Sequence, residues 1–191
     1  MEPSSAKSDI ALIKQFVRTQ DEQAFVALVN RYKDLALSVA ISVLKDKTWA
    51  EDAVQESFVK VYHSLPSLRR KAHFKTWLYR IVINTCYNER KRRRVTMEYG
   101  ETTELVSSIP PQQNKLREED QKRYIQLALE QLKPDEALVL RMFYLLELRI
   151  KEIERATGFS KAKIKVDLHR GRQNLSQILR TLLGSEIEDL L

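Results

Sequence analysis

One stretch of the chain, from His73 to Val95, changes character halfway along its length. Its first half places apolar side chains at the three- and four-residue spacing of a helix, from Phe74 to Cys86. Its second half continues into five consecutive cations, Arg90 to Arg94, which suit the negative end of a helix dipole. The pattern therefore predicts one helix that begins in a hydrophobic core and ends as a fixed cation cluster. Such a cluster indicates a polyanionic partner, with a solvated basic tail as the alternative.

The composition favours a helical protein with an anionic partner. The 191 residues include only four Gly and five Pro and carry a net charge of +7, which favours nucleic acid or an anionic surface. The single cysteine, Cys86, lies on the apolar side of the helix, so we expect a buried thiol rather than a nucleophile. One cysteine allows no intrachain disulfide, and no signal peptide or membrane-spanning run is visible. We therefore expect a cytoplasmic protein without membrane insertion.

Residues 8–95 are expected to form one compact helical domain. Helical periodicity predicts three helices before the basic one, over residues 9–19, 21–45 and 48–63. Asp21 is expected to cap the second of these, and Thr48 with Glu51 has the spacing of a capping box at the start of the third.

Residues 96–114 have no convincing periodicity and contain several glutamates, two serines and the pair Pro110-Pro111. We interpret them as an acidic flexible linker. The segment is long for a connection inside one domain, so it is expected to join two.

Residues 115–184 are expected to form a second helical domain. The last two predicted helices are joined by a short turn, in which Gly158 suits a left-handed position and Ser160 an N-cap. Two helices joined in this way are a helix-turn-helix candidate. Gly171 lies inside the final helix, where it indicates either a local weakness or a point of close approach.

Three blocks of the sequence resemble the group 4, or extracytoplasmic function (ECF), sigma factors of bacterial RNA polymerase. Ala50-Glu-Asp-Ala-Val-Gln-Glu-Ser-Phe58 is close to the family pattern AEDxxQExF, and Phe74-Lys-Thr-Trp-Leu-Tyr-Arg-Ile81 with Asn84 is close to FxxWLYRIxxN. The third block is the terminal helix-turn-helix. The resemblance implies an all-α fold of two small helical domains, a sigma2-like helical bundle and a sigma4-like helix-turn-helix domain, joined by a flexible linker.

The resemblance also implies a function. Such a protein binds core RNA polymerase and directs promoter-specific transcription initiation, here of a stress or cell-envelope regulon, without enzymatic activity or a cofactor. Its implied partners are the clamp helices of the largest polymerase subunit, the polymerase flap, promoter DNA and an anti-sigma factor.

Individual roles follow from the matched positions. The residues implied in polymerase docking are Glu51, Asp52, Gln55 and Glu56. The residues implied at the minus-ten element, where the strands separate and a base can be flipped out, are Arg69, Arg70, Lys71, Lys75, Tyr79, Arg80, Asn84, Asn88, Arg90, Lys91, Arg92, Arg93 and Arg94. The residues implied at the minus-thirty-five element are Ser160, Lys161, Lys163, Lys165, His169, Arg170 and Arg172.

Two finer expectations concern which way side chains face. On the basic helix, Trp77 is expected in the core, whereas Tyr79 and Arg80 are expected to face DNA. In the final helix, several residues depart from the family pattern S-x-G-T-V-K-S-R-L-x-R-A-R, and the departures are expected to add one cation and one anion to the DNA-facing side. They leave the promoter preference open. The departing residues are Ala162, Lys163, Val166 and Asp167.

Two other classes of protein are alternatives. A stand-alone helix-turn-helix regulator, such as a LuxR-like protein, would bind an operator without polymerase, but no dimerisation heptad or ligand-pocket signature accompanies the motif. A nucleic-acid enzyme is disfavoured, because His63, His73 and His169 are scattered and no metal-spaced carboxylates or phosphate-binding glycine loop are present.

Overall fold

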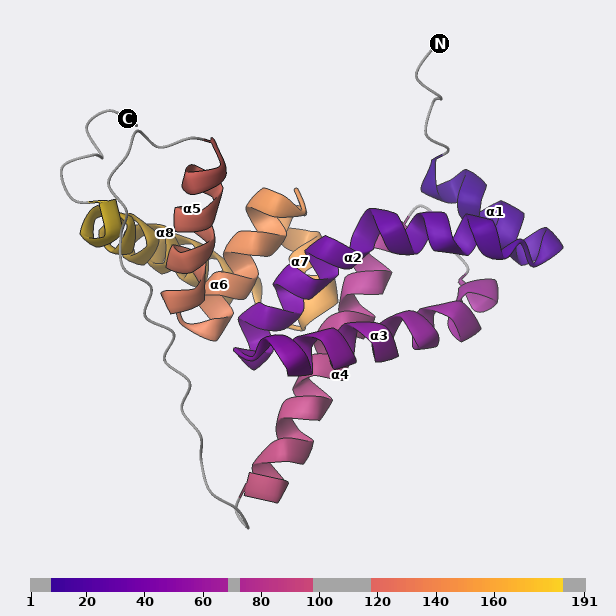
Figure 1. Cartoon of the computed structure of the whole chain (residues 1–191), viewed down its shortest axis with the longest axis horizontal. Helices are drawn as coiled ribbons and strands as arrows, with labels where there is room; N and C mark the ends of the chain where they lie inside the picture. Colours follow the sequence, from indigo (N-terminus) through magenta and orange to yellow (C-terminus); the bar gives the residue numbers. More distant parts are fainter. Residues whose placement is uncertain (1–7, 69–72, 98–117, 184–191) are drawn as a thin grey trace.

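The computed structural model describes residues 8–68, 73–97 and 118–183, and every regular element in these ranges is helical (Figure 1). The N-terminal half contains α1 (Asp9–Thr19), α2 (Glu22–Leu44), α3 (Lys47–Ser64), the short η1 (Leu65–Ser67) and α4 (Phe74–Met97). The C-terminal half contains α5 (Glu118–Gln131), α6 (Pro134–Leu140), the single π-helical turn η3 (Arg141–Leu145), α7 (Ile150–Thr157) and α8 (Lys161–Leu183). None of the helices in the described ranges combines the length and apolar character needed to cross a bilayer.

Of the two predicted helix caps in the N-terminal half, one forms as predicted and one does not. The Asp21 carboxylate caps α2 by accepting from the Gln23 amide at 2.9 Å, as predicted. At α3 the predicted Thr48 capping box is wrong, because Asp46 caps the helix instead and accepts from the Trp49 amide at 2.8 Å. Aspartate is a better N-cap than threonine, so the helix begins at Lys47 and Thr48 lies within its first turn.

The core of the N-terminal half is built from α1 to α4. An aromatic cluster of Phe16, Phe25 and Tyr62 joins α1, α2 and α3, with ring centroids 5.0–5.4 Å apart. Tyr32 of α2 contacts Phe74 at the start of α4 with centroids 5.5 Å apart. These tilted and edge-on pairs fix how the helices cross, and they hold the first turn of α4 against α2.

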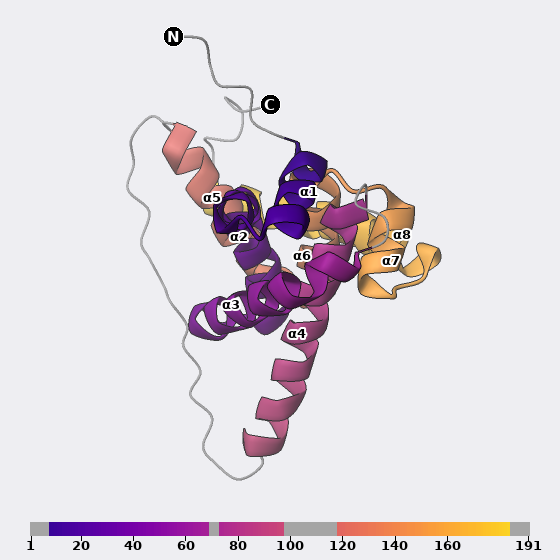
Figure 2. The same ribbon diagram turned by 90° about the vertical axis from the view of Figure 1, so that its right-hand side faces the viewer.

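The helix α4 is buried on more than one side. Phe74 and Cys86 are buried as predicted, but Trp77 is only half-buried, while Tyr79 and Ile83 are fully buried. The reason is that α4 packs against α2 and α3 on one side and against α7 on another. Its C-terminal turns extend beyond the other helices in both views (Figures 1 and 2). Burial raises the pKa of the Cys86 thiol to about 12.

The helix-turn-helix forms as the sequence predicts. Gly158 adopts φ 76°, and its amide donates to the Glu154 carbonyl at 2.9 Å, which ends α7. The Ser160 hydroxyl then accepts from the Lys163 amide at 3.2 Å at the start of α8. Gly171 is a point of close approach, because a Cβ at this position would lie 3.0 Å from Leu140 Cδ1 of α6.

The two halves contact each other through α4 with α7 and α2 with α6. The ammonium of Lys45, at the end of α2, donates to the carbonyls of Glu130 and Leu132 at 2.6 and 2.7 Å and so caps the end of α5. Arg141 Nε donates to Ser38 Oγ of α2 at 2.9 Å. The halves therefore share one continuous hydrophobic core. Of the predicted linker, residues 98–114 lie outside the described residues, and α4 reaches Met97.

Candidate protein and nucleic-acid interfaces

The solvent side of α3 is acidic and lies opposite its buried side. Ala53, Val54, Ser57 and Phe58 are buried. The predicted docking residues are all exposed: Glu51, Asp52, Gln55 and Glu56. Glu56 pairs with Lys60 at 2.7 Å, and such an exposed pair contributes little to stability. The face is therefore available to a basic partner.

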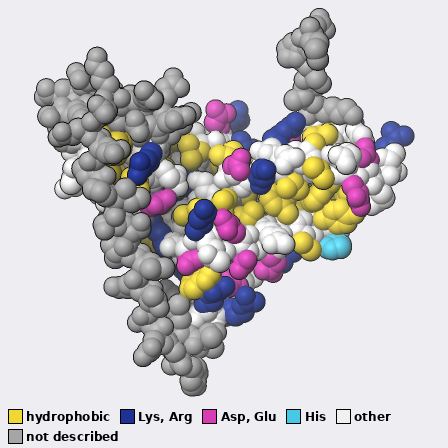
Figure 3. Space-filling view, in the orientation of Figure 1, with side chains coloured by type: hydrophobic (Ala, Val, Ile, Leu, Met, Phe, Trp, Pro, Cys, Tyr) yellow, Lys and Arg dark blue, Asp and Glu magenta, His cyan; other side chains and the backbone are white. Residues whose placement is uncertain are grey.

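An apolar pocket of about 430 Å³ lies beside this acidic face, between α2 and α3. It is lined by Phe25, Val29, Gln55, Phe58, Val59, Tyr62 and His63. Val59 is 53% exposed, and Figure 3 shows hydrophobic side chains gathered over α2 and α3. The sequence analysis missed this pocket, because periodicity along a single helix does not show a hollow between two helices. The one feature of the sequence that could have indicated the pocket is Val59, an apolar residue that lies outside the buried stripe of α3.

A polar and cationic strip runs along the exposed side of α4. Its members recur at three- or four-residue spacing and are all exposed: Arg80, Asn84, Asn88 and Lys91. Arg92 is exposed as well. Lys75 is half-buried, and Arg90, also half-buried, lies over the Tyr87 ring at 5.3 Å. The C-terminal turns of α4, which follow Lys91, project beyond the other helices (Figure 2).

Part of the cation cluster holds α4 in place. Glu89, only 6% exposed, pairs with Arg93 and with Arg92 Nη2, the latter at 2.6 Å. The Arg93 guanidinium also lies 4.0 Å from the centre of the Trp49 ring at the start of α3, a cation–π contact. The hydrogen bond from Arg93 lowers the pKa of Glu89. Arg93 therefore joins α4 to α3 in this arrangement, a role that the sequence analysis missed.

Tyr79 is the clearest correction among the predicted DNA contacts. Its side chain is fully buried, and its hydroxyl has no hydrogen-bond partner among the described residues. Burial raises the pKa of Tyr79. The prediction that it faces DNA assumed that α4 buries one stripe only, whereas the helix is covered on two sides. Arg69, Arg70, Lys71 and the side chain of Arg94 lie outside the described residues.

The helix α8 presents most of its predicted cations to solvent. The exposed members are Lys161, Lys165, His169, Arg170 and Arg172, and the capping residue Ser160 is exposed as well. Ile164 and Leu168 face the core. Arg172 lies over the exposed Tyr144 ring at 5.7 Å.

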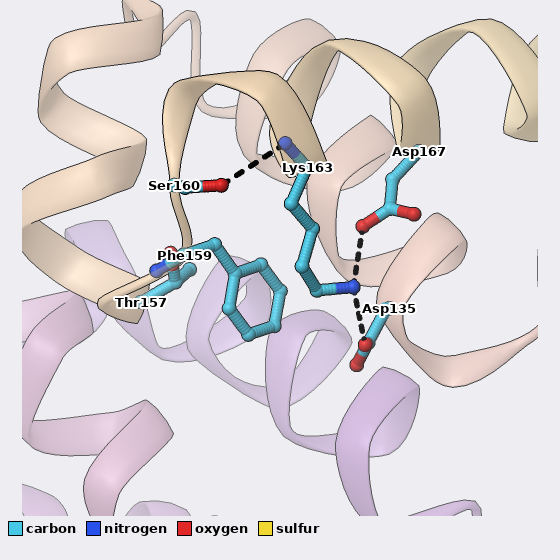
Figure 4. Close-up of polar contacts among 6 residues, drawn as sticks. All are labelled: Asp135, Thr157, Phe159, Ser160, Lys163 and Asp167. Carbon is cyan, nitrogen blue, oxygen red and sulfur yellow. Dashed lines mark hydrogen bonds and ion pairs between the residues drawn. The ribbon is translucent and has the colours of Figure 1, made fainter.

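Lys163 and Asp167 differ from the prediction. The Lys163 ammonium pairs with Asp135 of α6 at 2.7 Å and with Asp167 at 2.8 Å, and it lies 4.5 Å from the centre of the Phe159 ring (Figure 4). Desolvation alone would lower the pKa of Lys163, but the two carboxylates outweigh it and raise that pKa. Asp167 is only 8% exposed. The predicted extra cation and anion thus neutralise each other beside α6 rather than facing DNA.

Comparison with known proteins gives matches to both halves of the chain. The family described as Sigma-70 region 2 matches residues 28–96, and the family described as Sigma-70, region 4 matches residues 122–175. The RNA polymerase sigma-H factor of Pseudomonas aeruginosa is 32% identical over 180 residues, covering 87% of this chain and 92% of that protein. The ECF RNA polymerase sigma factor SigW of Bacillus subtilis is 28% identical over 180 residues, covering 89% and 96%.

Two solved structures have a similar fold. The sigma factor RpoE in complex with the anti-sigma factor NepR from Bartonella quintana has a TM-score of 0.64 and 25% sequence identity, covering 82% of this chain and 96% of that chain. CnrH in complex with the cytosolic domain of CnrY has a TM-score of 0.60 and 22% identity, covering 92% and 99%.

Proposed function

The chain belongs to the sigma-70 family, as a group 4 (extracytoplasmic function) sigma factor of bacterial RNA polymerase that directs promoter-specific transcription initiation, and we propose how its exposed surfaces serve that function. The observation that carries the proposal is the combination of three surfaces on one chain. These are an acidic face with an adjoining apolar pocket on α3, a cationic strip on α4 and a cationic face on α8. Two DNA-binding faces on separate halves suit two separated promoter elements.

The acidic face of α3 and the neighbouring pocket dock on core polymerase. An apolar centre beside a charged rim is the usual composition of a protein interface. The carboxylates of Asp52 and Glu56 steer a basic partner and fix its register, and the pocket beside Val59 takes an apolar side chain of that partner. The partner is the pair of clamp helices on the largest polymerase subunit, with the C-terminal half reaching the flap.

The strip on α4 binds the minus-ten element. Arg80 and Lys91 neutralise phosphates, while Asn84 and Asn88 supply amide donors and acceptors for exposed base edges. The preceding segment with Arg69, Arg70 and Lys71 completes this site. Because the contacts are mostly ionic, we expect complex formation to weaken steeply with salt.

The exposed side of α8 binds the minus-thirty-five element in the major groove. Lys165 and Arg172 lie on the solvent side of a helix that follows a helix-turn-helix turn. In that motif the second helix enters the groove with its N-terminal residues against the bases. Gly171 supports this placement, because it allows α8 to lie close to Leu140 with its opposite side outward.

An anti-sigma factor is the remaining partner. The similar RpoE structure was solved with the anti-sigma factor NepR. By analogy, an anti-sigma factor of this chain covers the pocket between α2 and α3 and so excludes polymerase. The protein acts in the cytoplasm on a stress or cell-envelope regulon, as a binding subunit without an enzymatic reaction of its own.

Transcription from promoter templates tests the docking face. Added to core polymerase, the wild-type chain is expected to give promoter-specific transcripts, and Asp52→Lys and Glu56→Lys are each expected to reduce core binding at least tenfold. Asp34→Lys, which reverses an exposed carboxylate of α2 outside the pocket lining, is the charge-matched control and should bind normally. Unchanged core binding by both α3 variants would remove the proposed docking face. Promoter binding without polymerase would instead support a stand-alone regulator.

A further inference from the structure

Over its first two turns, the side of α8 that faces away from the core is apolar, although the helix is cationic overall. Ile164 and Gly171 face α6. At about 100° per residue, Ala162 and Val166 lie about 160° and about 200° around the helix from Ile164, directly opposite the core. Both are exposed, and Val166 is 44% exposed. We call these two side chains the apolar crest of α8.

Cations stand on both sides of the apolar crest. Lys161, Lys165 and Arg172 lie about 60–100° around the helix from Ile164, and Arg170 lies at about 240°, on the other side. All four are exposed. In a duplex, phosphates border the groove and base edges form its floor. A helix placed with its flanking cations against the phosphates therefore directs the apolar crest at the bases.

Folding does not account for the apolar character of the crest. Neither Ala162 nor Val166 belongs to the hydrophobic core or packs against it. Valine is also a weaker helix former than the straight-chain residues that usually occupy exposed helix positions. Of the charged departures from the family pattern, Lys163 pairs with Asp135 of α6 and also with the other, Asp167. This pairing leaves Ala162 and Val166 as the departures that can touch DNA.

We propose that the apolar crest reads the C5-methyl groups of thymines in the minus-thirty-five element. In the major groove the thymine methyl is the apolar feature that distinguishes this base, and small apolar side chains recognise it by contact. Ala162 and Val166 are the second and sixth residues of α8, within the N-terminal part that meets base edges in helix-turn-helix proteins. The inference rests on the proposed promoter-binding function and adds a base preference to it.

Replacing thymine by uracil tests the contact directly, because the change removes only the methyl group. The full chain with core polymerase is first used to enrich a preferred sequence from duplexes randomised in the minus-thirty-five region. Each thymine of that sequence is then replaced singly by deoxyuridine. We expect one or two positions at which holoenzyme binding weakens about fourfold, the effect of losing one buried methyl-sized group. At those positions 5-methylcytosine should bind better than cytosine.

Variants assign the effect to the crest. Val166→Ala is expected to abolish the difference between thymine and uracil at one of the positions where uracil weakens binding of the wild type. Val166→Ser, which restores the family residue, is expected to do the same. Val26→Ala, which shortens a similarly exposed valine of α2 (45% exposed), should keep the wild-type ratio of affinities for the thymine and uracil templates. Lys165→Ala should weaken both templates equally, because a phosphate contact does not sense the methyl group.

Two results separate this inference from the function on which it rests. If holoenzyme selects a sequence but no thymine-to-uracil change matters, or Val166→Ala keeps the ratio, the apolar crest does not read methyl groups, while the promoter function stands. If polymerase with this chain selects no sequence at all, the promoter function itself fails.

Discussion

Glu89 shows how one carboxylate stabilises a helix that otherwise ends in cations. It is nearly buried and pairs with Arg92 and Arg93, while Arg93 also covers Trp49. A carboxylate hydrogen-bonded in this way has a lowered pKa, chiefly through Arg93. Its contribution to stability is therefore fully present above the ordinary glutamate pKa and is lost as the pH falls through the lower folded value.

We expect Glu89→Gln to lower the free energy of unfolding by about 1–3 kcal/mol at pH 7, because both hydrogen bonds lose the carboxylate charge and one of the two acceptor oxygens becomes an amide nitrogen. The difference from wild type should shrink as the pH falls below about 4.3, where the wild-type carboxylate begins to protonate in the unfolded chain. Urea denaturation at a series of pH values measures this. Glu56→Gln, which breaks the exposed pair with Lys60, is the control and should change stability by less than about 1 kcal/mol. A difference independent of pH would contradict the assigned role.

Single residues also mark where sequence reasoning succeeded. Asp21, Gly158 and Ser160 were assigned correctly, because caps and turns depend on neighbours within a few positions. Lys163 was misassigned because its partner Asp135 is 28 residues away in the sequence. A sequence pattern places a cation on a helix, but it does not show which carboxylate of another helix will lie beside it.

The helix α8 is positioned by its close approach to α6. Gly171 lies against Leu140, so there is little room for a side chain. We expect Gly171→Val to lower the free energy of unfolding by about 1–3 kcal/mol, because a branched side chain overpacks the contact. Thermal or urea denaturation measures this. Ser176→Val places the same residue at an exposed position of α8 and should cost less than about 1 kcal/mol. Equal effects of the two variants would show that the close approach does not matter.

The helix α4 shows why a correct helix assignment can still misplace its side chains. Periodicity predicted the helix, the buried Phe74 and the cationic end, all of which are local properties. Tyr79 is buried with its ring 6.4 Å from that of Tyr32 in α2, a contact that no pattern within α4 specifies. The pocket beside Val59 was missed for a related reason, since it forms only when α2 and α3 lie side by side.

The contact between the two halves has a consequence for promoter binding. The minus-ten and minus-thirty-five elements lie about 25 base pairs apart, or about 85 Å of duplex at 3.4 Å per step. The helix α4 contacts α7 directly, and α8 is only about 35 Å long at 1.5 Å per residue. If the proposed faces of α4 and α8 bind these two elements, we expect the halves to separate on the polymerase.

Arg141 makes the packed arrangement less stable than its apolar contacts alone would. The side chain is 1% exposed, and neither Nη1 nor Nη2 has a hydrogen-bond partner among the described residues. Burial lowers the pKa of Arg141 to about 10. The pKa of Lys45 is also lowered, mainly by desolvation and in addition by the nearby charge of Arg141. Separation of the halves would return the Arg141 guanidinium to water, which offsets part of the lost apolar contact.

We expect energy transfer between dyes placed at Lys33→Cys and Gln177→Cys to fall when core polymerase and promoter DNA are added to the full chain. Arg141→Met, which removes the unsatisfied charge, should stabilise the packed arrangement by about 1–4 kcal/mol. A higher polymerase concentration should then be needed for the same fall in energy transfer. Arg180→Met removes an exposed cation of α8 and should leave the midpoint unchanged. Constant energy transfer during active transcription would show that the halves stay together.

The burial of Cys86 means that thiol-reactive dyes do not label the native protein. It is the only thiol in the chain, and it is sealed inside the N-terminal core with its pKa raised to about 12. Maleimide dyes therefore attach to surface cysteines introduced elsewhere and leave the native one unmodified. The rate at which Cys86 itself is slowly alkylated would then report global opening of the core formed by α1 to α4. This opening is separate from the movement of one half against the other.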